Sequence, residues 1–517
     1  MPVSPTIWLQ EALANSGATA GNQNQARLVQ CADGSFWVIW RDAFDAGVAI
    51  DPGADLVGQR YDVLGNPIGG LVRINPAGYT ANNERDAELA ADLSGSGFFT
   101  VFESADLADG DLVDIVLVKH GADGAVIGSP LVIAADPNGS GAPNNLANPD
   151  VAVASATNGL VVWERTNGAG DTDIRARFFD PVSNTPIGAA FTLADSSDDK
   201  TVPQVVALAT GTYAVMSSDE NLGSSTQHDV AFKVIDQSGT TLASGTVTSG
   251  SGDETVGSIV ALSGGGFVIS WSDSTVESGN VYWARYDSVG VQQGGTQTVA
   301  AGANAQVENR LFALNDGGFG ILWEDESAAR INARVYTATG SPVGGTVMID
   351  DALAVGGLGA LTLGDGRTLI GFGQFDAGSA SNDIRFGVLD ARTEPNNPSA
   401  YLPDPMVIGT IDDDTIFALN IGDIVYGWDG DDFLIQSTHI AATLIGGEGN
   451  DWVLVNSPDA NSFVDGGDGI DTLELGTAVA AAPFTVFLGV DVTVLPDVQS
   501  AVGFENFVFN GSGAGTI

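Results

Sequence analysis

Short apolar segments alternate with polar, glycine-rich segments through the first 390 residues, and this order repeats seven times. Short strands at close intervals, about four in each repeat, predict an all-β chain. Seven repeats of this size are typical of a β-propeller with seven blades. In each repeat we assign the most apolar segment to the second strand of a blade. These segments are 36–40, 98–102, 160–163, 213–217, 267–271, 319–323 and 368–372.

The seventh repeat ends without a clear fourth strand, which would leave one blade incomplete. Residues 6–12 precede the first complete repeat and resemble the fourth strands at 71–74 and 347–349. We expect this N-terminal strand to complete blade seven, because a closed ring has no open sheet edge. The expected domain order is a seven-bladed β-propeller over residues 1–392, closed by strand 6–12, and then a linker over 393–408.

Six of the seven repeats carry a Lys or Arg on the expected third strand, and acidic residues follow the second strand in five repeats. Two interpretations are open: a ring of cations that binds an anionic glycan, or an ion pair repeated between neighbouring strands. The repeated acid near each base favours the ion pair. The basic residues are Arg60, Lys119, Arg177, Lys233, Arg285 and Arg334, and the acidic ones are Glu103, Glu164, Asp219, Asp273 and Glu324.

A different pattern begins after the linker. The nine-residue pattern G-G-x-G-x-D-x-U-x, in which U is a large apolar residue, is typical of a calcium-binding parallel β-helix. Residues 446–454 and 466–474 match it fully, and 427–435 match it with one departure. Two degenerate copies, 409–417 and 418–426, precede them in register. Glycine permits the tight turns, the Asp adds a carboxylate, and each x-U-x triplet predicts a short strand with its apolar residue facing inward.

These copies predict a calcium-binding parallel β-roll over residues 409–475, followed at 476–517 by a β cap or the start of a further repeat block. Successive turns lie on opposite sides, so one ion would be shared by turns 18 residues apart, the separation of Asp414 and Asp432. Carboxylate and carbonyl oxygens are the ligands that Ca²⁺ prefers. The candidate metal ligands are Gly409, Ile411, Asp414, Asp423, Gly427, Asp429, Asp431, Asp432, Gly446, Glu448, Asn450, Asp451, Gly466, Asp468, Ile470 and Asp471. The expected inward residues are Ile416, Val425, Leu434, Val453, Phe463 and Leu473.

The nonapeptides resemble the repeats-in-toxin (RTX) family of calcium-binding bacterial proteins. The seven repeats resemble the propeller-like domain that precedes such rolls in large bacterial surface proteins. The resemblance implies calcium as the cofactor, and type I secretion to an extracellular or cell-surface location. The first residues show no charged start followed by a long apolar run, so no cleavable secretion signal is expected there.

Charge narrows the classes of partner. The chain has 65 acidic and 18 basic residues, a formal net charge of −47, and residues 393–517 contain no Lys or Arg. Such a surface repels nucleic acid and anionic lipid, and it attracts hard cations. The single cysteine, Cys31, excludes an internal disulfide bond. No run of 18 apolar residues occurs, so no membrane-spanning helix is expected.

Catalytic motifs are not found. The sequence contains no nucleophile elbow, no zinc-protease motif and no phosphate-binding loop. A carboxylate pair for glycoside hydrolysis remains open among so many acids. We expect a protein that is not an enzyme: a secreted calcium-binding extracellular protein acting in cell-surface or matrix adhesion through its propeller. The alternatives are a calcium-dependent, self-assembling surface-layer or appendage subunit, and a propeller-borne glycan-active enzyme. The expected partners are Ca²⁺ and a glycan, a surface protein or further copies of the chain.

Overall fold

The computed structural model of the protein describes most of the chain, and every structural statement below concerns the residues that it describes. They contain strands β1 to β39 and one short 3₁₀ helix, η1 (Ala77–Tyr79), and among them no helix is long and apolar enough to cross a membrane. They are 5–14, 23–42, 54–79, 83–106, 112–135, 145–167, 170–195, 199–220, 228–248, 253–273, 279–300, 306–326, 328–352, 354, 357–376, 381–391, 406–409, 413–418, 422–437, 441–456, 462–475, 485–486, 500–502, 504 and 506–509.

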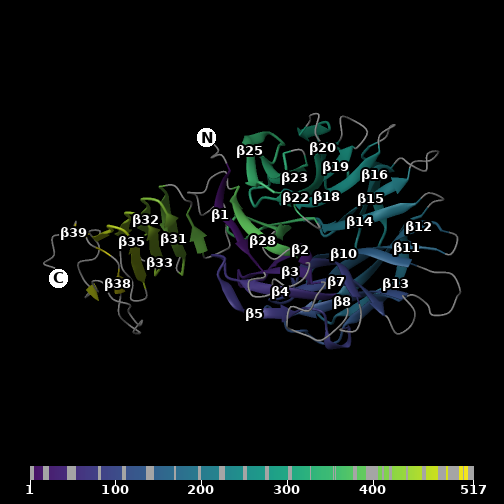
Figure 1. Ribbon diagram of the computed structural model, residues 1–517, viewed down its shortest axis with the longest axis horizontal. Coiled ribbons are helices and arrows are strands. Elements are labelled where there is room, and N and C mark those ends of the chain that lie inside the picture. Colours follow the sequence, from purple (N-terminus) through teal and green to yellow (C-terminus); the bar gives the residue numbers. More distant parts are fainter. Residues whose placement is uncertain are drawn as a thin grey trace. The chain divides into compact units, whose positions relative to one another are not determined.

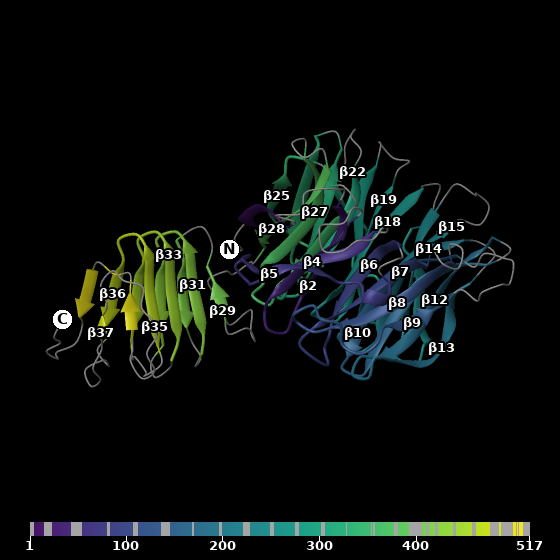
Figure 2. The same ribbon diagram turned by 60° about the horizontal axis from the view of Figure 1, so that its bottom comes forward.

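Seven four-stranded antiparallel sheets form the blades of a β-propeller (Figures 1 and 2), which confirms the predicted all-β, seven-bladed fold. The first strands of successive blades contact one another, and the first strand of blade seven contacts that of blade one, so the ring is continuous. In blade seven the outer strand is β1 (Thr6–Leu13), which lies beside β28 (Ser381–Asp390).

The remaining strands of the propeller follow the chain from the first strand of each blade to the fourth. Blades one to three are β2 (Gln23–Gln30), β3 (Phe36–Asp42), β4 (Asp55–Tyr61), β5 (Pro67–Arg73); β6 (Asn83–Ala91), β7 (Phe98–Asp106), β8 (Leu112–His120), β9 (Leu131–Ala134); and β10 (Asn145–Ser155), β11 (Asn158–Thr166), β12 (Thr172–Asp180), β13 (Thr185–Ala194). Blades four to seven are β14 (Lys200–Ala207), β15 (Tyr213–Glu220), β16 (His228–Ile235), β17 (Thr241–Thr246); β18 (Glu254–Leu262), β19 (Gly266–Asp273), β20 (Asn280–Asp287), β21 (Gln297–Ala300); β22 (Gln306–Ala313), β23 (Phe319–Asp325), β24 (Arg330–Tyr336), β25 (Pro342–Asp350); and β26 (Leu358–Thr362), β27 (Thr368–Asp376), with β28 and β1.

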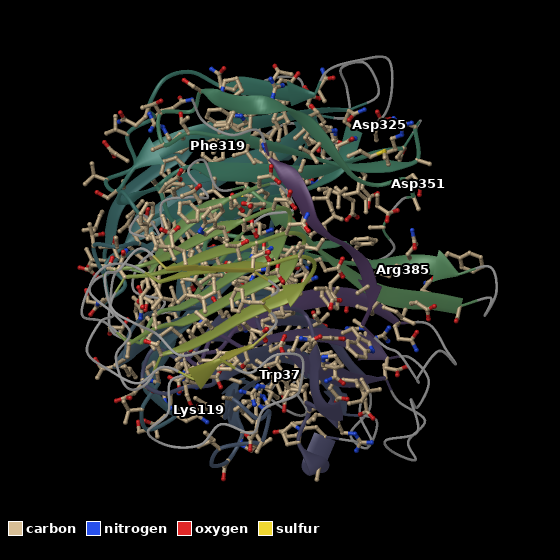
Figure 3. The ribbon with its side chains drawn as sticks, turned by 90° about the vertical axis from the view of Figure 1, so that its left-hand side faces the viewer. Trp37, Lys119, Phe319, Asp325, Asp351 and Arg385 are labelled. Atoms are coloured by element: carbon tan, nitrogen blue, oxygen red, sulfur yellow. The ribbon has the colours of Figure 1, made fainter. Side chains whose placement is uncertain are left out.

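The second strand of each blade is buried on both faces. In β3 every side chain from Phe36 to Trp40 is at most 1% exposed. Blades pack face to face, so a strand in the middle of a blade has a neighbouring blade on each side, and its sequence is continuously apolar rather than alternating. Trp37, labelled in Figure 3, packs against Phe98 of blade two and donates its indole N–H to the carbonyl of Ala122, 3.0 Å away.

The third-strand cations do not pair with the acids that follow the second strand, so that prediction is wrong. Arg60 contacts Asp33 at 2.5 Å, and Lys119 (Figure 3) contacts Asp92 at 3.0 Å. Both acids lie in the turn between the first and second strands. Lys233 instead donates to the carbonyl of Leu193 in the preceding blade at 2.6 Å. These cations therefore stabilise turns and blade contacts.

The C-terminal part contains two parallel sheets built from alternating strands. One has the order β29-β31-β33-β35-β38-β37 and the other the order β30-β32-β34-β36-β39. In the second sheet Ile416, Leu434, Val453 and Leu473 pair in register and are fully buried. The expected inward position of Phe463 is wrong, because Val464 is the buried residue of that strand. The strands are β29 (Met406–Ile408), β30 (Thr415–Ala418), β31 (Ile424–Asp429), β32 (Phe433–Gln436), β33 (Thr443–Glu448), β34 (Trp452–Val455), β35 (Phe463–Asp468), β36 (Thr472–Leu475), β37 (Thr485–Val486), β38 (Ser500–Val502) and β39 (Asn506–Phe509).

Candidate functional site

The first strands of the propeller share an irregularity. Six of them show a break in pairing register with the second strand of their blade, the mark of a β-bulge. Five of these bulges hold a residue other than glycine with positive φ, a conformation that costs free energy and that is concentrated at functional sites. These residues are Gln25 (φ 57°), Asp86 (49°), Asn148 (48°), Val202 (50°) and Glu308 (40°).

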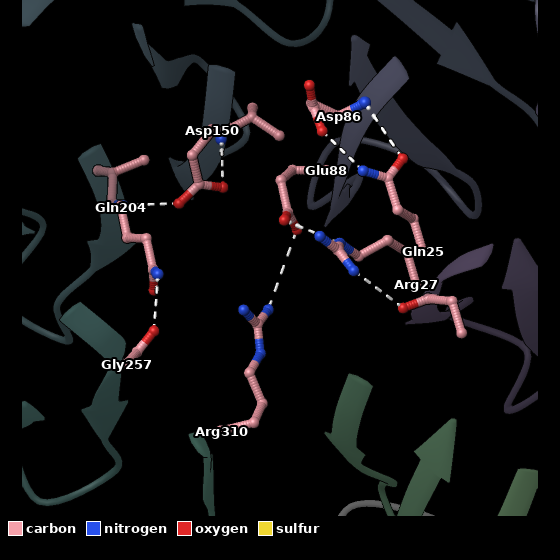
Figure 4. Close-up of polar contacts among 11 residues, drawn as sticks. Gln25, Arg27, Asp86, Glu88, Asp150, Gln204, Gly257 and Arg310 are labelled. Carbon is pink, nitrogen blue, oxygen red and sulfur yellow. Dashed lines mark hydrogen bonds and ion pairs between the residues drawn. The ribbon is translucent and has the colours of Figure 1, made fainter. Parts of the chain in front are cut away.

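A second set of side chains lies two residues after each of these bulge positions. They are equivalent in register, because Arg27 pairs opposite Ile39 just as Glu88 pairs opposite Val101 and Asp150 opposite Val162. We call the bulge residues and these side chains together the axial network, shown in part in Figure 4. The axial network consists of Gln25, Arg27, Asp86, Glu88, Asn148, Asp150, Val202, Gln204, Glu308 and Arg310.

Contacts within the axial network join blades that are distant in the sequence. Arg27 of blade one binds Glu88 of blade two at 2.8 Å, and Arg310 of blade six lies 3.9 Å from the other oxygen of the same carboxylate. Gln25 donates its amide N–H to the carboxylate of Asp86 at 2.6 Å. One carboxylate thus sits between two guanidinium groups, and a second is fixed by an amide (Figure 4).

Two further carboxyls of the network are held nearer the neutral form. Burial raises the pKa of Asp150 to about 7, and the negative charge of Glu88 adds to the effect. Both Asp150 oxygens also accept backbone N–H groups, from Val151 and Val205, at 2.7 Å. Glu308 differs, because its side chain is exposed while the surrounding protein still raises the pKa of its carboxyl. Asp150 is therefore held as a structural bridge between blades, whereas Glu308 is open to a substrate.

Three second-strand glutamates accept backbone N–H groups of the next blade, and two of these groups belong to bulge residues. Glu103 accepts the backbone N–H of Asn148 at 2.7 Å, and Glu164 accepts that of Val202 at 2.5 Å. Glu324 accepts the N–H of Ala354, in front of the first strand of blade seven, at 3.1 Å. Burial raises the pKa of Glu103 and of Glu324 to about 7. These acids, predicted to pair with third-strand cations, are positioning residues for the next blade, and Glu103 also pairs with Arg85 of the first strand at 2.6 Å.

The axial network combines the groups that general acid–base chemistry needs. A protonated carboxyl can donate a proton, an ionised carboxylate can accept one, and an environment that separates their pKa values assigns the two roles. Glu308, whose carboxyl pKa is raised, and Asp86, whose carboxylate accepts the amide of Gln25, both lie on strained bulges, and Arg27 and Arg310 belong to the same ring of first strands.

The predicted metal ligands lie in the C-terminal sheets. Ile411 falls outside the described residues, and of Asp429 only its position at the end of β31 is described. The buried members are Gly409, Asp414, Asp423, Gly427, Asp432, Gly446, Asp451, Gly466 and Asp471, and the exposed members are Asp431, Glu448, Asn450, Asp468 and Ile470.

Four of the predicted aspartates form a ladder. The backbone N–H groups of Asp414, Asp432 and Asp451 donate to Oδ1 of Asp432, Asp451 and Asp471 in turn, each at 2.8 Å. The second oxygens of Asp432 and Asp451 are buried and accept no hydrogen bond. Burial raises the pKa of Asp432 to about 8 and that of Asp451 to about 7.

Backbone oxygens converge on these unpaired carboxylate atoms. A Cβ placed on Gly427 would lie 2.2 Å from Asp432 Oδ2 and 2.4 Å from the carbonyl oxygen of Gly446. A Cβ on Gly446 would lie 2.1 Å from both Asp451 Oδ2 and the carbonyl oxygen of Gly466. Among the described residues no three His, Cys, Asp or Glu side chains gather as metal ligands, so an ion here would need these carbonyls. Oxygen donors of this kind fit a hard cation such as Ca²⁺.

Comparisons with known proteins bear on the fold of the propeller. No model of a known protein family matches the sequence, and no curated protein is similar to it. Among solved structures, the chain is similar to an α-L-arabinofuranosidase from Fusarium graminearum (12% identity over 75% of this chain and 97% of that one, TM-score 0.40). It is also similar to an α-L-arabinanase from Penicillium chrysogenum (11%, 75% and 98%, TM-score 0.42) and to an endo-arabinanase from Bacillus licheniformis (12%, 53% and 98%, TM-score 0.32).

These comparisons correct the functional expectation drawn from the sequence. The prediction of a non-catalytic protein acting in adhesion is contradicted, because the similar structures named above are glycoside hydrolases. The search for sequence motifs missed the axial network because its residues come from separate repeats. Charged residues near the start of four first strands, Arg27, Glu88, Asp150 and Arg310, were the one available indication.

Proposed function

We propose that the propeller is a glycan-cleaving enzyme whose active site is the axial network. The observation that carries the proposal is the pair Glu308 and Asp86. Both are held on strained bulges of first strands, one with a raised carboxyl pKa and the other with its carboxylate bound by Gln25. Strain that persists in equivalent places must be sustained by the surrounding fold, and at Asp86 the side chain of Gln25 contributes by binding both its carboxylate and its backbone N–H.

The proposed reaction is hydrolysis of a glycosidic bond. Water attacks the anomeric carbon, the bond from that carbon to the leaving oxygen breaks, and the leaving oxygen takes the proton of Glu308. Asp86 takes a proton from the attacking water, so the enzyme regains its starting state after one proton returns from Asp86 to Glu308 through solvent. Arg27 and Arg310, already neutralised in part by Glu88, are placed to donate hydrogen bonds to sugar hydroxyls.

The test measures release of reducing sugars from a panel of neutral and acidic polysaccharides, arabinan included. Glu308→Gln and Asp86→Asn should each lower kcat by about 10²-fold or more, the range for loss of a general acid or base. Glu326→Gln, which removes an exposed carboxylate of the same blade, is the matched control and should keep the wild-type rate. Absence of turnover by the wild type, or full activity of both variants, would refute the proposal.

We also propose that the C-terminal sheets are a calcium-binding β-roll of the RTX type, and that the protein is secreted. The support is the buried, unpaired Oδ2 atoms of Asp432 and Asp451 and the carbonyl oxygens beside them. Asp432 with Gly446, and Asp451 with Gly466, would hold the ions, together with other carbonyls among the predicted ligands. Calcium would neutralise carboxylates that the fold otherwise buries at a cost, so folding would follow export from a calcium-poor cytosol.

A further inference from the structure

The outer face of one C-terminal sheet carries exposed apolar side chains. Strands β30, β32 and β34 turn Ile416, Leu434 and Val453 toward the buried core, so the alternate residues face outward. Phe417 is 40% exposed and Trp452 is 43% exposed, and their neighbours are partly exposed. We call this set the aromatic face: Phe417, Phe433, Ile435, Trp452 and Leu454. Contiguous exposed apolar side chains mark interaction sites more often than single ones do.

The rings of the aromatic face are fixed in place. Phe433 and Trp452 pair directly across neighbouring strands, with ring centroids 6.2 Å apart and planes inclined at 72°. The indole N–H of Trp452 donates to the carboxylate of Glu474 on the next strand at 2.9 Å. A side chain that is already ordered loses little conformational entropy when it binds a partner.

Charge restricts the partner. Asp413 and Asp431, both exposed, precede strands β30 and β32, and Glu474 borders the face on the other side. Because residues 393–517 contain no Lys or Arg, an anionic polymer or membrane would be repelled. A second copy of this chain, docked by the same face, would bring its own acidic residues close to these, and the like charges would repel. The uncharged centre and the hydrogen-bond acceptors at its border suit a neutral, hydroxyl-rich partner.

We propose that the aromatic face binds a neutral polysaccharide. A sugar ring has an apolar C–H face that can lie on Phe417 or Trp452, while its hydroxyls can donate to Glu474 and to Thr472. The inference goes beyond the catalytic proposal and does not depend on it, because binding at this sheet needs no turnover in the propeller.

The test uses the full chain with Ca²⁺ present, in a Glu308→Gln background that prevents loss of the probe. Binding to insoluble cellulose, chitin, arabinan and xylan is measured by depletion, with polygalacturonate as an anionic comparison. Trp452→Thr and Phe417→Thr keep a good strand former at each position and should weaken binding at least about ten-fold, as expected for aromatic residues at the centre of an interface. Phe375→Thr, which removes a 60% exposed aromatic of β27, is the matched control and should bind like its parent.

Hydroxyl-radical footprinting of the unmutated chain gives a readout that does not depend on the variants folding. Phe417 and Trp452 should become protected when the bound polysaccharide is added, and Phe375 should not. The proposal is overturned if no neutral polysaccharide binds, if Phe417 and Trp452 stay unprotected, or if polygalacturonate or a basic protein binds more tightly. It is also overturned if sedimentation shows a dimer that Trp452→Thr abolishes.

Discussion

Protonation at acid pH should stabilise the C-terminal sheets in the absence of calcium. In the unfolded chain the Asp432 and Asp451 carboxyls titrate near 3.8, whereas in the folded chain burial raises their pKa values to about 8 and about 7. Because the folded pKa lies above the unfolded one, the folded chain holds more protons between these values. Its stability is therefore greatest at acid pH and falls as the pH rises from about 4 to about 8.

The size of the effect follows from the same pKa values. One pKa unit corresponds to about 1.4 kcal/mol, so the free energy of unfolding should fall by roughly 6 kcal/mol for Asp432 and by about 4 kcal/mol for Asp451. The two groups interact, so the sum is an upper bound. Calcium at 100 times its dissociation constant restores about 2.7 kcal/mol for each ion bound only by the folded state. Two ions would offset about half of this upper bound.

The assay is hydrogen exchange with peptide resolution on the full chain, corrected for the intrinsic pH dependence of exchange. With chelator, peptides within 424–456 should be protected at pH 4 to 5 and unprotected at pH 8. Millimolar Ca²⁺ should restore their protection at pH 8. In the double variant Asp432→Asn, Asp451→Asn the pH dependence and the calcium response should both vanish. Equal protection at the two pH values without metal, or pH dependence retained by the double variant, would refute the reasoning.

Four further outcomes are expected. Glu164→Ala should lower the free energy of unfolding of the propeller by about 1–3 kcal/mol in denaturant titrations, because the N–H of Val202 and the amide of Asn148 both lose their acceptor; an unchanged midpoint would contradict this role. Leu434→Ala should cost the C-terminal sheets about 2–5 kcal/mol, measured by the same exchange assay, since the side chain is fully buried. Deleting residues 1–13 removes β1 and exposes the edge of β28, so the melting temperature should fall or aggregation should appear, and a parent-like melt would show that β1 is dispensable. The rate of glycan cleavage should fall as the pH rises past the raised pKa of Glu308, because a general acid must be protonated; a rate that instead increased through this range would exclude Glu308 as the proton donor.

The propeller was predictable from the sequence because its strongest feature is local. Segments such as Phe36–Trp40 are buried on both faces, so they are apolar throughout and recur visibly in every repeat. The first strands carry no such mark. Residues such as Arg27 and Asp150 are polar although they lie in the ring of first strands, and their partners come from other blades. Contacts of this kind depend on how the blades are arranged around the ring. A sequence window of nine or fifty residues does not contain both partners of such a contact.

Two smaller errors have equally physical causes. The third-strand cations were matched to acids on the adjacent strand, but Arg60 is long enough to reach Asp33 in the turn instead. Phe463 was expected to face inward, yet side chains alternate along a strand, and the pairing of β33 with β35 places Val464 opposite the buried Leu444.

The variation around the ring of first strands limits how alike the blades can become. Equivalent positions carry Arg27, Glu88, Asp150, Gln204 and Arg310. If tandem duplication produced the seven blades, the first closed ring would have placed seven copies of one side chain around a single axis. Seven charged side chains of one sign at this position would repel one another. The side chains at this position must therefore differ between blades for the ring to close. Sequence similarity between the blades should be highest in their second strands and lowest in their first strands, which line the axis.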